Sequence, residues 1–271
     1  MAKYKIGITE AGDAGLDLSW EDKLDSVDGA ILITKRLSHE FFDAVLRHKD
    51  KVIVHATVTG YGKTVVEPNV PTSGWQLGSA SALVKCGFPK EQIVIRVDPI
   101  IPTTKGCVRA CNVMRTAILL GFNRFRISLI DMYPHVRERF SEAGLPIPYD
   151  GKFSPSKEDY GNVNAVVLAC KMLYQGLLRP AKELRIEACA EPGLFTDDRI
   201  GVIQCGCISA YDLALLGLDA DDADQAGHQR KNCLCYSGKV ELLQTKQQCP
   251  HKCLYCYWRQ EMHSNHKYTP A

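Results

Sequence analysis

Short apolar runs alternate with longer stretches of mixed polarity along the chain up to about residue 195. The short runs are rich in isoleucine and valine, and several contain almost no polar residue, which is typical of parallel strands covered on both faces. They predict strands at Tyr4–Thr9, Ala30–Thr34, Val52–Thr57, Ile93–Val97, Phe125–Ile130 and Leu184–Cys189. The stretches between them predict helices, for example at Leu37–Arg47, Trp75–Cys86, Val108–Leu120 and Val163–Gln175.

The order of these elements predicts an α/β fold. Because strand and helix alternate, neighbouring strands are expected to be parallel and joined by right-handed crossovers. A chain of 271 residues can bury one substantial core, so we expect a single domain built as a partial (β/α) barrel of the TIM type. Residues 1–195 would form most of the barrel, and residues 196–236 are a cysteine-rich segment. Residues 237–271 add one more strand, Lys239–Gln244, directly before the last cysteines.

Polar side chains follow the predicted strands at the points where the strands end. Glu10 and Asp13 follow the first strand, and Lys35 follows the second. The residues that follow later strands are Thr57, Thr59, Asp98, Asp131 and Glu191. In α/β barrels the active site is built at the carboxyl ends of the strands, so we expect these side chains to surround one pocket. The alternative is that they cap the helices that follow.

Net charge, the N-terminal segment and the cysteine count indicate which binding partners and which compartment to expect. The formal net charge is only +2, which predicts no strong electrostatic binding to DNA or membranes. The N-terminus lacks the apolar stretch of a signal peptide, and no run of about 18 apolar residues exists, so we expect a cytoplasmic protein without membrane contact. The 12 cysteines then indicate metal binding or catalysis rather than disulfides.

Three cysteines are closely spaced near the C-terminus, in the segment Cys249-Pro-His-Lys-Cys253-Leu-Tyr-Cys256. Three thiolates at this spacing can wrap around one four-iron cluster and leave one iron without a protein ligand. An open metal position is what a reactive centre needs, whereas a structural zinc site is usually closed by four ligands. The alternative for this loop is a zinc site completed by His251 or another cysteine.

This loop resembles the signature of the radical S-adenosylmethionine superfamily, in which an aromatic residue, here Tyr255, precedes the third cysteine. The resemblance implies a [4Fe-4S] cluster whose open iron binds the amino and carboxylate groups of S-adenosylmethionine, with Tyr255 near the adenine. It implies reductive cleavage of that cofactor to a 5′-deoxyadenosyl radical, which abstracts hydrogen from the substrate. It also implies an electron donor of the flavodoxin or ferredoxin type.

In that superfamily the cluster loop follows the first strand, whereas here it follows the last. A circular permutation resolves the difference, because the termini of a barrel lie close together. Lys239–Gln244 would be the superfamily's first strand and Tyr4–Thr9 its second. Over almost its whole length the chain is similar to a group with this arrangement, the domain-of-unknown-function family numbered 1848. The matching segments are Thr34-Lys35, Thr57–Gly62, Glu67–Pro71, Arg96–Ile100, Ser128–Asp131 with Tyr133, Cys189–Glu191, Gln229-Arg230 and Cys233–Cys235.

The chain departs from that group at the end of its first strand. Thr9-Glu-Ala-Gly-Asp13 stands where the group has an Arg-Arg-Thr-Asp pattern, which allows for a different substrate. Glu10 is well placed to contact the amino group of S-adenosylmethionine. The run Arg96-Val-Asp98-Pro is also similar to spore photoproduct lyase, a thymine-repair enzyme, but the net charge does not support DNA as a partner.

A second group of cysteines comprises Cys189, Cys205, Cys207, Cys233 and Cys235. Cys189 ends a predicted strand, and the others lie in loops that lead towards the C-terminal cysteines. Four thiolates can hold an auxiliary iron–sulfur cluster, and the family resemblance favours Cys189, Cys207, Cys233 and Cys235. The alternatives are a closed zinc site and plain buried thiols.

Taken together, the sequence predicts a radical enzyme that rearranges or modifies a small polar or nucleoside-type substrate, or a modified nucleobase or amino acid. The candidates for substrate contact or proton transfer are Lys35, Asp131, Tyr133, Glu187 and Glu191. The candidates for contact with S-adenosylmethionine, besides Tyr255 and Glu10, are Thr57, Thr59, Arg96, Asp98 and Ser128. Arg96 and Asp98 can equally form a structural ion pair. The alternative function is a non-catalytic iron–sulfur or zinc protein that senses redox state or scaffolds partners.

Overall fold

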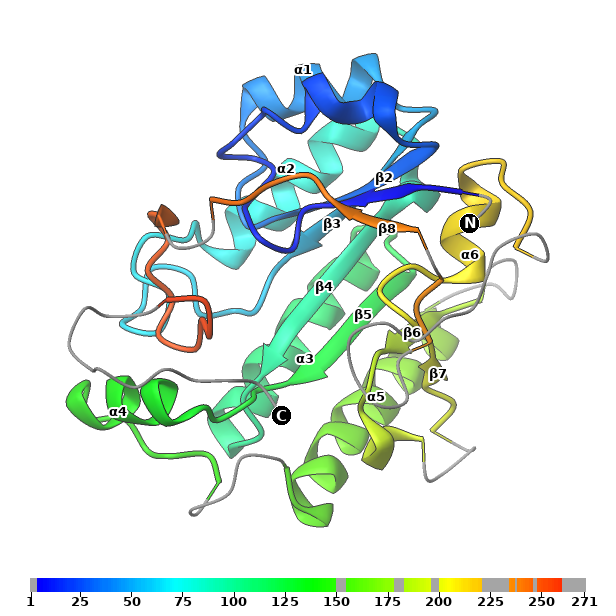
Figure 1. The fold of residues 1–271 in the computed structure, drawn as a ribbon. Coiled ribbons are helices and arrows are strands. Elements are labelled where there is room, and N and C mark those ends of the chain that lie inside the picture. Colours follow the sequence, from blue (N-terminus) through cyan, green and yellow to red (C-terminus); the bar gives the residue numbers. More distant parts are fainter. Residues whose placement is uncertain are drawn as a thin grey trace.

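Eight parallel strands form one sheet in the computed structural model, which describes residues 4–149, 155–177, 183–195, 200–220, 234–236, 238–245 and 248–259 (Figure 1). The strands are β1 (Ile6–Ile8), β2 (Gly29–Thr34), β3 (Val52–Thr57), β4 (Ile93–Ile100), β5 (Arg124–Leu129), β6 (Arg185–Ala188), β7 (Ile203–Gln204) and β8 (Lys239–Glu241). Their order in the sheet is β7-β6-β5-β4-β3-β2-β1-β8. Gly7 of β1 pairs with Val240 of β8, so the last strand lies beside the first.

Helices connect consecutive strands and cover both faces of the sheet. The helices α1 (His39–Arg47), α2 (Ser73–Lys85), α3 (Thr104–Leu119) and α5 (Lys157–Leu177) pack on one face. The short helix α6 (Ala210–Leu215) packs on the other face. Helix α4 (Pro134–Glu142) follows β5 and packs with the loops beyond the carboxyl ends of the strands. Single 3-10 turns lie at Glu21–Ser26, Lys90–Gln92 and Pro192–Leu194.

Hydroxyl side chains start the helices that follow β2, β3 and β4. Ser38, Thr72 and Thr103 each accept a hydrogen bond from the backbone N–H of the residue three positions later. Such a cap satisfies a donor that has no partner inside the helix. These helix starts are therefore encoded locally, and they leave the strand ends free to build a site.

Alternate residues of β2, β3 and β4 face two separate apolar cores. Leu32, Val54 and Ile95 pack with α1, α2, α3 and α5 on one side. Ile33, Ile53 and Val94 pack on the other side, against Leu213 of α6 among others. Burial on both faces is why the strands read as nearly continuous apolar runs in the sequence.

A buried ion cluster lies between the sheet and α6, on the face that α6 covers. Arg126 donates to Glu187 at 2.8 Å, and Arg124 donates to Glu187 at 3.2 Å and to Asp212 at 2.5 Å. Both carboxylates are fully buried. Burial opposes the charge of Asp212, but Arg124 and Arg126 outweigh that effect and hold the pKa of this carboxyl below its usual value. The cluster fastens α6, which carries Asp212, to β5 and β6.

The predicted α/β class with a parallel sheet is confirmed, and all seven predicted strands are present with ends shifted by a few residues. Strand β4 runs beyond its predicted end to Ile100, whereas β8 stops at Glu241. The elements β7, α4 and α6 were not predicted, because they are short and lie among charged or cysteine-rich residues. Among the described residues, no helix combines the length and the apolar character that crossing a membrane requires.

Candidate functional site

A cavity of about 280 Å³ lies at the carboxyl ends of the strands. Residues from the ends of β1 to β6 line it, namely Glu10, Lys35, Thr57, Asp98, Ser128 and Cys189. The cysteines of both groups face the same space: Cys249, Cys253 and Cys256 from the C-terminal loop, and Cys189, Cys207 and Cys235 from the second group. The prediction that strand-end side chains surround one pocket is thus confirmed for these residues, and Arg96, Asp131 and Tyr255 join them.

We call residues 249–256, which carry Cys249, Cys253 and Cys256, the cluster loop. A distant segment of the chain holds this loop through hydrogen bonds to its backbone. The Leu254 N–H donates to the Val66 carbonyl at 2.9 Å, and the Asn69 side-chain amide donates to the Pro250 carbonyl at 2.7 Å. Both partners lie in the loop between β3 and α2, which runs beside the cluster loop in Figure 1. Lys252 adopts the left-handed conformation, with φ of 52°, where the chain turns between the first two cysteines.

Arg139 of α4 holds the same loop from the other side. Its guanidinium donates to the carbonyls of Leu254 at 2.8 Å, of Cys256 at 2.7 Å and of Arg259 at 2.7 Å. The side chain is only 4% exposed, and charged donors in such surroundings form strong hydrogen bonds. Arg139 therefore fixes the path of the backbone around the third cysteine. The sequence analysis did not identify it, because nothing local distinguishes it from the other arginines of that region.

His251 of the cluster loop and Asp13, which follows β1, form a buried contact. The His251 Nε2 lies 2.9 Å from the Asp13 Oδ2, and its Nδ1 lies 3.4 Å from the Asn69 carbonyl oxygen. Asp13 also accepts hydrogen bonds from the Thr34 hydroxyl and the Lys35 N–H. Burial opposes the charge of Asp13, yet these donors and His251 lower its pKa overall. Both ring nitrogens of His251 are thus directed at oxygen atoms of the protein.

Glu67 organises a second polar cluster between the loop and the strand ends. This fully buried carboxylate accepts hydrogen bonds from Lys35 Nζ at 2.9 Å, from the Thr59 hydroxyl at 2.7 Å and from the Tyr255 hydroxyl. The Lys35 ammonium also lies 5.4 Å from the centre of the Tyr255 ring. Burial disfavours the charge on Lys35, but the neighbouring Glu67 carboxylate raises its pKa overall. Glu67 was noticed in the sequence only as part of a matching segment.

Two further ion pairs line the cavity. Arg96 Nε donates to Asp98 at 2.7 Å, so these two residues form the ion pair that the sequence allowed as an alternative. Lys239 of β8 lies 2.5 Å from a carboxylate oxygen of Glu10, and the Glu10 N–H donates to Glu241 at 3.1 Å. Burial raises the pKa of Glu10 despite its contact with Lys239. Strand β8 thus supplies charged partners for the end of β1.

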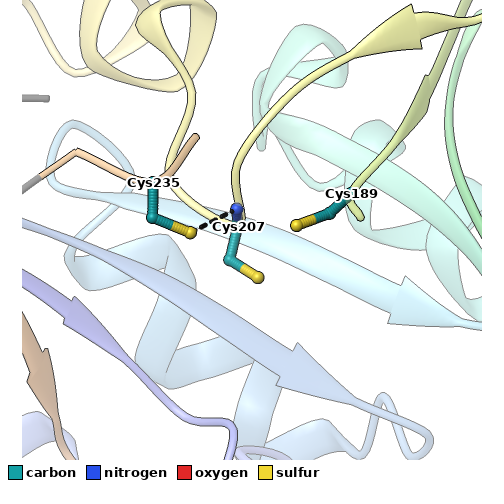
Figure 2. Close-up of side chains that lie close together, drawn as sticks. All are labelled: Cys189, Cys207 and Cys235. Carbon is teal, nitrogen blue, oxygen red and sulfur yellow. Dashed lines mark hydrogen bonds between the residues drawn. The ribbon is translucent and has the colours of Figure 1, made fainter. Parts of the chain in front are cut away.

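The second cysteine group brings together three distant segments. Cys189 follows β6, Cys207 lies after β7 and Cys235 precedes β8. Their three sulfur atoms all lie within 4.8 Å of one another, and in Figure 2 the side chains of Cys189 and Cys235 point towards each other from either side of Cys207. The Cys207 N–H donates to the Cys235 sulfur at 3.0 Å. Cys233 lies outside the described residues, and Cys205 is buried but does not belong to this group.

Four of the predicted site residues lie away from the cavity lining. Glu187 is buried in the ion cluster beneath it, and Thr59 is bound to Glu67. Tyr133 stacks on the rings of His135 and Tyr257, with 5.6 Å between ring centres in both pairs. Glu191 accepts hydrogen bonds from the Leu129 N–H at 2.8 Å and the Tyr160 hydroxyl at 3.0 Å, and burial raises its pKa to about 7.

His55 and Thr57 add polar atoms to the cavity wall that the protein itself does not use. Both residues line the cavity from β3 and are buried. Among the described residues, the two ring nitrogens of His55 and the hydroxyl of Thr57 have no hydrogen-bond partner. Buried polar groups without partners are uncommon in native proteins, so these atoms indicate a site made to receive a ligand. The sequence analysis missed His55, which lies within a strand rather than at its end.

A comparison with protein families matches most of the chain to a family model. A family model described as "Domain of unknown function (DUF1848)" matches residues 19–258, which is most of the chain. No curated protein and no solved structure matches the chain. The matched range includes both groups of cysteines and the residues that hold the cluster loop in place.

Proposed function

The chain belongs to the family described as domain of unknown function DUF1848, and from this premise we propose that it is a radical S-adenosylmethionine enzyme. Cys249, Cys253 and Cys256 would hold its [4Fe-4S] cluster. The observation that carries the proposal is the convergence of these three cysteines on the cavity at the strand ends. When bound, the cluster and S-adenosylmethionine supply an electron transfer that cleaves the sulfonium and produces a radical able to abstract a substrate hydrogen.

The residues of the cluster loop fit such a cluster better than a closed zinc site. The loop offers three thiols, and its only histidine, His251, is directed at Asp13 and the Asn69 carbonyl. The three sulfurs of the loop, all within the described residues, do not all lie within 4.8 Å of one another. Thiolates that share one zinc ion stand about 3.8 Å apart, given a Zn–S distance of about 2.3 Å in a tetrahedron. Wider spacing suits thiolates that bind separate irons.

The residues around the loop have defined tasks under this proposal. Arg139, Val66 and Asn69 hold the backbone of the loop whose three cysteines line the cavity. Glu67 fixes the Tyr255 ring through its hydroxyl, which orients the ring for stacking on an adenine. The hydroxyl of Thr57 has no partner among the described residues, so it can serve as donor and acceptor for the ribose or the methionine part of the cofactor.

The charged side chains of the lining have complementary tasks. Glu10 faces the cavity as an acceptor for the cofactor's amino group, and Arg96 with Asp98 presents a paired charge beside it. Ser128 and Asp131 extend the polar wall along the end of β5. Burial raises the pKa of the Cys253 thiol to about 12, and the positive charge of Lys35 beside it partly opposes this effect. Asp131 and Lys35 are the lining residues that we assign to the substrate.

The position of β8 supports a circular permutation of the superfamily fold. In that fold the cluster loop follows the first strand of the barrel. Here β8 pairs with β1 at the edge of the sheet, and the cluster loop follows β8. Counted from β8, the strand order β8-β1-β2-β3-β4-β5-β6-β7 runs through the sheet without interruption. Under this proposal the termini lie between the superfamily's first and second strands, and the cluster loop keeps its place after the first strand.

The dimensions of the cavity favour a small substrate. A volume of about 280 Å³ is close to the lower limit for small-molecule sites, so a nucleoside-type or other small polar substrate suits it beside the cofactor. We propose a flavodoxin or ferredoxin-type protein as the electron donor. The lining holds cations and carboxylates together, as a polar substrate requires.

Anaerobic reconstitution tests the proposal directly. The protein is loaded with iron and sulfide, then given S-adenosylmethionine and dithionite, and 5′-deoxyadenosine is quantified by mass spectrometry. We expect turnover in the wild type and in the control variant Cys86→Ala, because Cys86 is exposed and lies outside both groups. The variant Cys249→Ala/Cys253→Ala/Cys256→Ala should release none. Iron-loaded wild type without 5′-deoxyadenosine, or a colourless zinc protein, would refute the proposal and favour a sensor or scaffold.

A further inference from the structure

We propose that Cys189, Cys207 and Cys235 form a second, separate metal centre that binds a thiophilic metal through three thiolates. These three cysteines come from the end of β6, the loop after β7 and the segment before β8. Their sulfur atoms nevertheless all lie within 4.8 Å of one another (Figure 2). Such a convergence of three sulfurs from distant segments is what a metal site requires and what packing alone has no reason to produce.

The spacing of the sulfurs matches a metal ion shared by all three. Thiolates around one tetrahedral ion with metal–sulfur distances of about 2.3 Å stand about 3.8 Å apart. The sulfurs here lie no more than 4.8 Å apart, which is close to that value, so small side-chain rotations can bring them into position. The same thiolates can instead hold an auxiliary iron–sulfur cluster after a larger adjustment. Both occupants use the same chemistry, and metal analysis distinguishes them.

Charged side chains surround the group of three sulfurs. Arg126 donates to the Cys207 carbonyl at 2.8 Å and interacts electrostatically with Cys207. Lys239 interacts electrostatically with Cys207 and Cys235, and Arg96 interacts with Cys207. Without metal, the hydrogen bonds to Cys207 and Cys235 and burial raise the pKa of the Cys189 thiol. A bound metal would displace the thiol protons, and the three cations lie where they balance the negative charge of its ligands.

The location of the group gives the centre a role beyond structure. All three cysteines line the cavity that also receives Cys249, Cys253 and Cys256. A metal bound there faces whatever molecule occupies the cavity. The centre does not depend on chemistry at the cluster loop, so its existence and the proposed radical function can be tested separately.

Cobalt titration tests the centre in a protein that lacks the first one. The probe is Co²⁺ added under anaerobic conditions to the variant Cys249→Ala/Cys253→Ala/Cys256→Ala. We expect the near-ultraviolet charge-transfer absorption of cobalt bound to thiolates, saturating at one ion for each chain. Adding Cys207→Ala should abolish this absorption, whereas adding Cys205→Ala should keep it, because Cys205 lies two residues away and outside the group.

A second measurement needs no substitution and so does not depend on the folding of a variant. Wild-type protein is alkylated with iodoacetamide with and without Zn²⁺, and modified cysteines are located by peptide mass spectrometry. We expect alkylation of Cys189, Cys207 and Cys235 to slow by about 100-fold when free zinc is about 100 times its dissociation constant. The exposed Cys86 serves as the control and should react equally in both samples.

Metal and sulfide analysis then identifies the occupant. Reconstitution of the triple variant with iron and sulfide tests for the auxiliary cluster, and retention of one metal ion without acid-labile sulfide identifies a single-ion site. Either result supports a second metal centre. The proposal is overturned if the triple variant gives no cobalt–thiolate absorption and zinc leaves the alkylation of the three cysteines unchanged.

Discussion

The guanidinium of Arg139 donates a hydrogen bond of 2.7 Å to the carbonyl oxygen of Cys256, although 117 residues separate the two in the chain. Through this bond, helix α4 positions the third cysteine of the cluster loop. The loop has little regular structure of its own, and its shape depends on partners from the loop after β3 and from α4. This dependence makes the candidate centre sensitive to residues that never touch a metal.

Replacement of Arg139 by alanine should loosen the cluster loop. Three carbonyl groups lose a charged donor, and the loss of such a bond typically costs about 1–3 kcal/mol. We expect reconstituted Arg139→Ala to lose its iron to a chelator at least about tenfold faster than the wild type, since about 1.4 kcal/mol corresponds to a factor of ten. Arg137→Ala, which changes a neighbour on the same helix, is the matched control. Equal iron loss in both variants would contradict a positioning role for Arg139.

The Lys35–Glu67 pair should show strong energetic coupling. Glu67 is fully buried and bonded to Lys35, so Glu67→Gln leaves a mostly buried ammonium without its counter-charge. We expect a loss of about 3 kcal/mol in the free energy of unfolding, measured with denaturant on metal-free protein. Lys35→Met/Glu67→Gln should recover part of this loss because it removes both charges. Strict additivity of the two single changes would show that the pair contributes little.

The ion cluster beneath the cavity should make stability depend on acid. The pKa of Asp212 is lower in the folded protein than its usual value of about 3.9, so its stabilising effect is fully present above about pH 4. The effect is lost as the pH falls through the lowered folded-state pKa. We expect Asp212→Asn to destabilise the protein by about 3 kcal/mol at pH 7 and by less at pH 3.5, in urea unfolding. The exposed Asp25→Asn variant should show no such pH dependence.

Tyr255 should contribute to cofactor binding through its ring more than through its hydroxyl. Aromatic stacking is worth about 0.5–1.5 kcal/mol, so Tyr255→Leu should weaken binding of S-adenosylmethionine to the iron-loaded protein by about tenfold. Tyr255→Phe keeps the ring and loses only the bond to Glu67, so a smaller decrease is expected. Calorimetric titration under anaerobic conditions measures both affinities. Full affinity in Tyr255→Leu would place the adenine elsewhere in the cavity.

Much of the site could be predicted from local sequence patterns. Cys249, Cys253 and Cys256 are recognisable because the spacing of ligands within one loop is a local property. Glu10, Lys35, Thr57, Asp98 and Ser128 could be found because residues at the carboxyl ends of parallel strands converge. Glu187 lies at the end of a strand and Glu191 follows it, yet neither lines the cavity. The Glu187 side chain pairs with Arg126, and the Glu191 side chain accepts a hydrogen bond from the Leu129 N–H. The sequence contains no sign of these partners.

The sequence alone determined the α/β class, most strand and helix positions and the identity of the cysteines, because apolar periodicity, hydroxyl caps and ligand spacing act over a few residues. Only the tertiary structure decided that Arg139 and Glu67 hold the cluster loop. That Cys189, Cys207 and Cys235 meet and that β8 pairs with β1 was expected from the family resemblance alone, and the tertiary structure brings these segments together. Each of these contacts joins segments far apart in the chain. Their formation depends on how the packed sheet and helices bring those segments together, which no local pattern encodes.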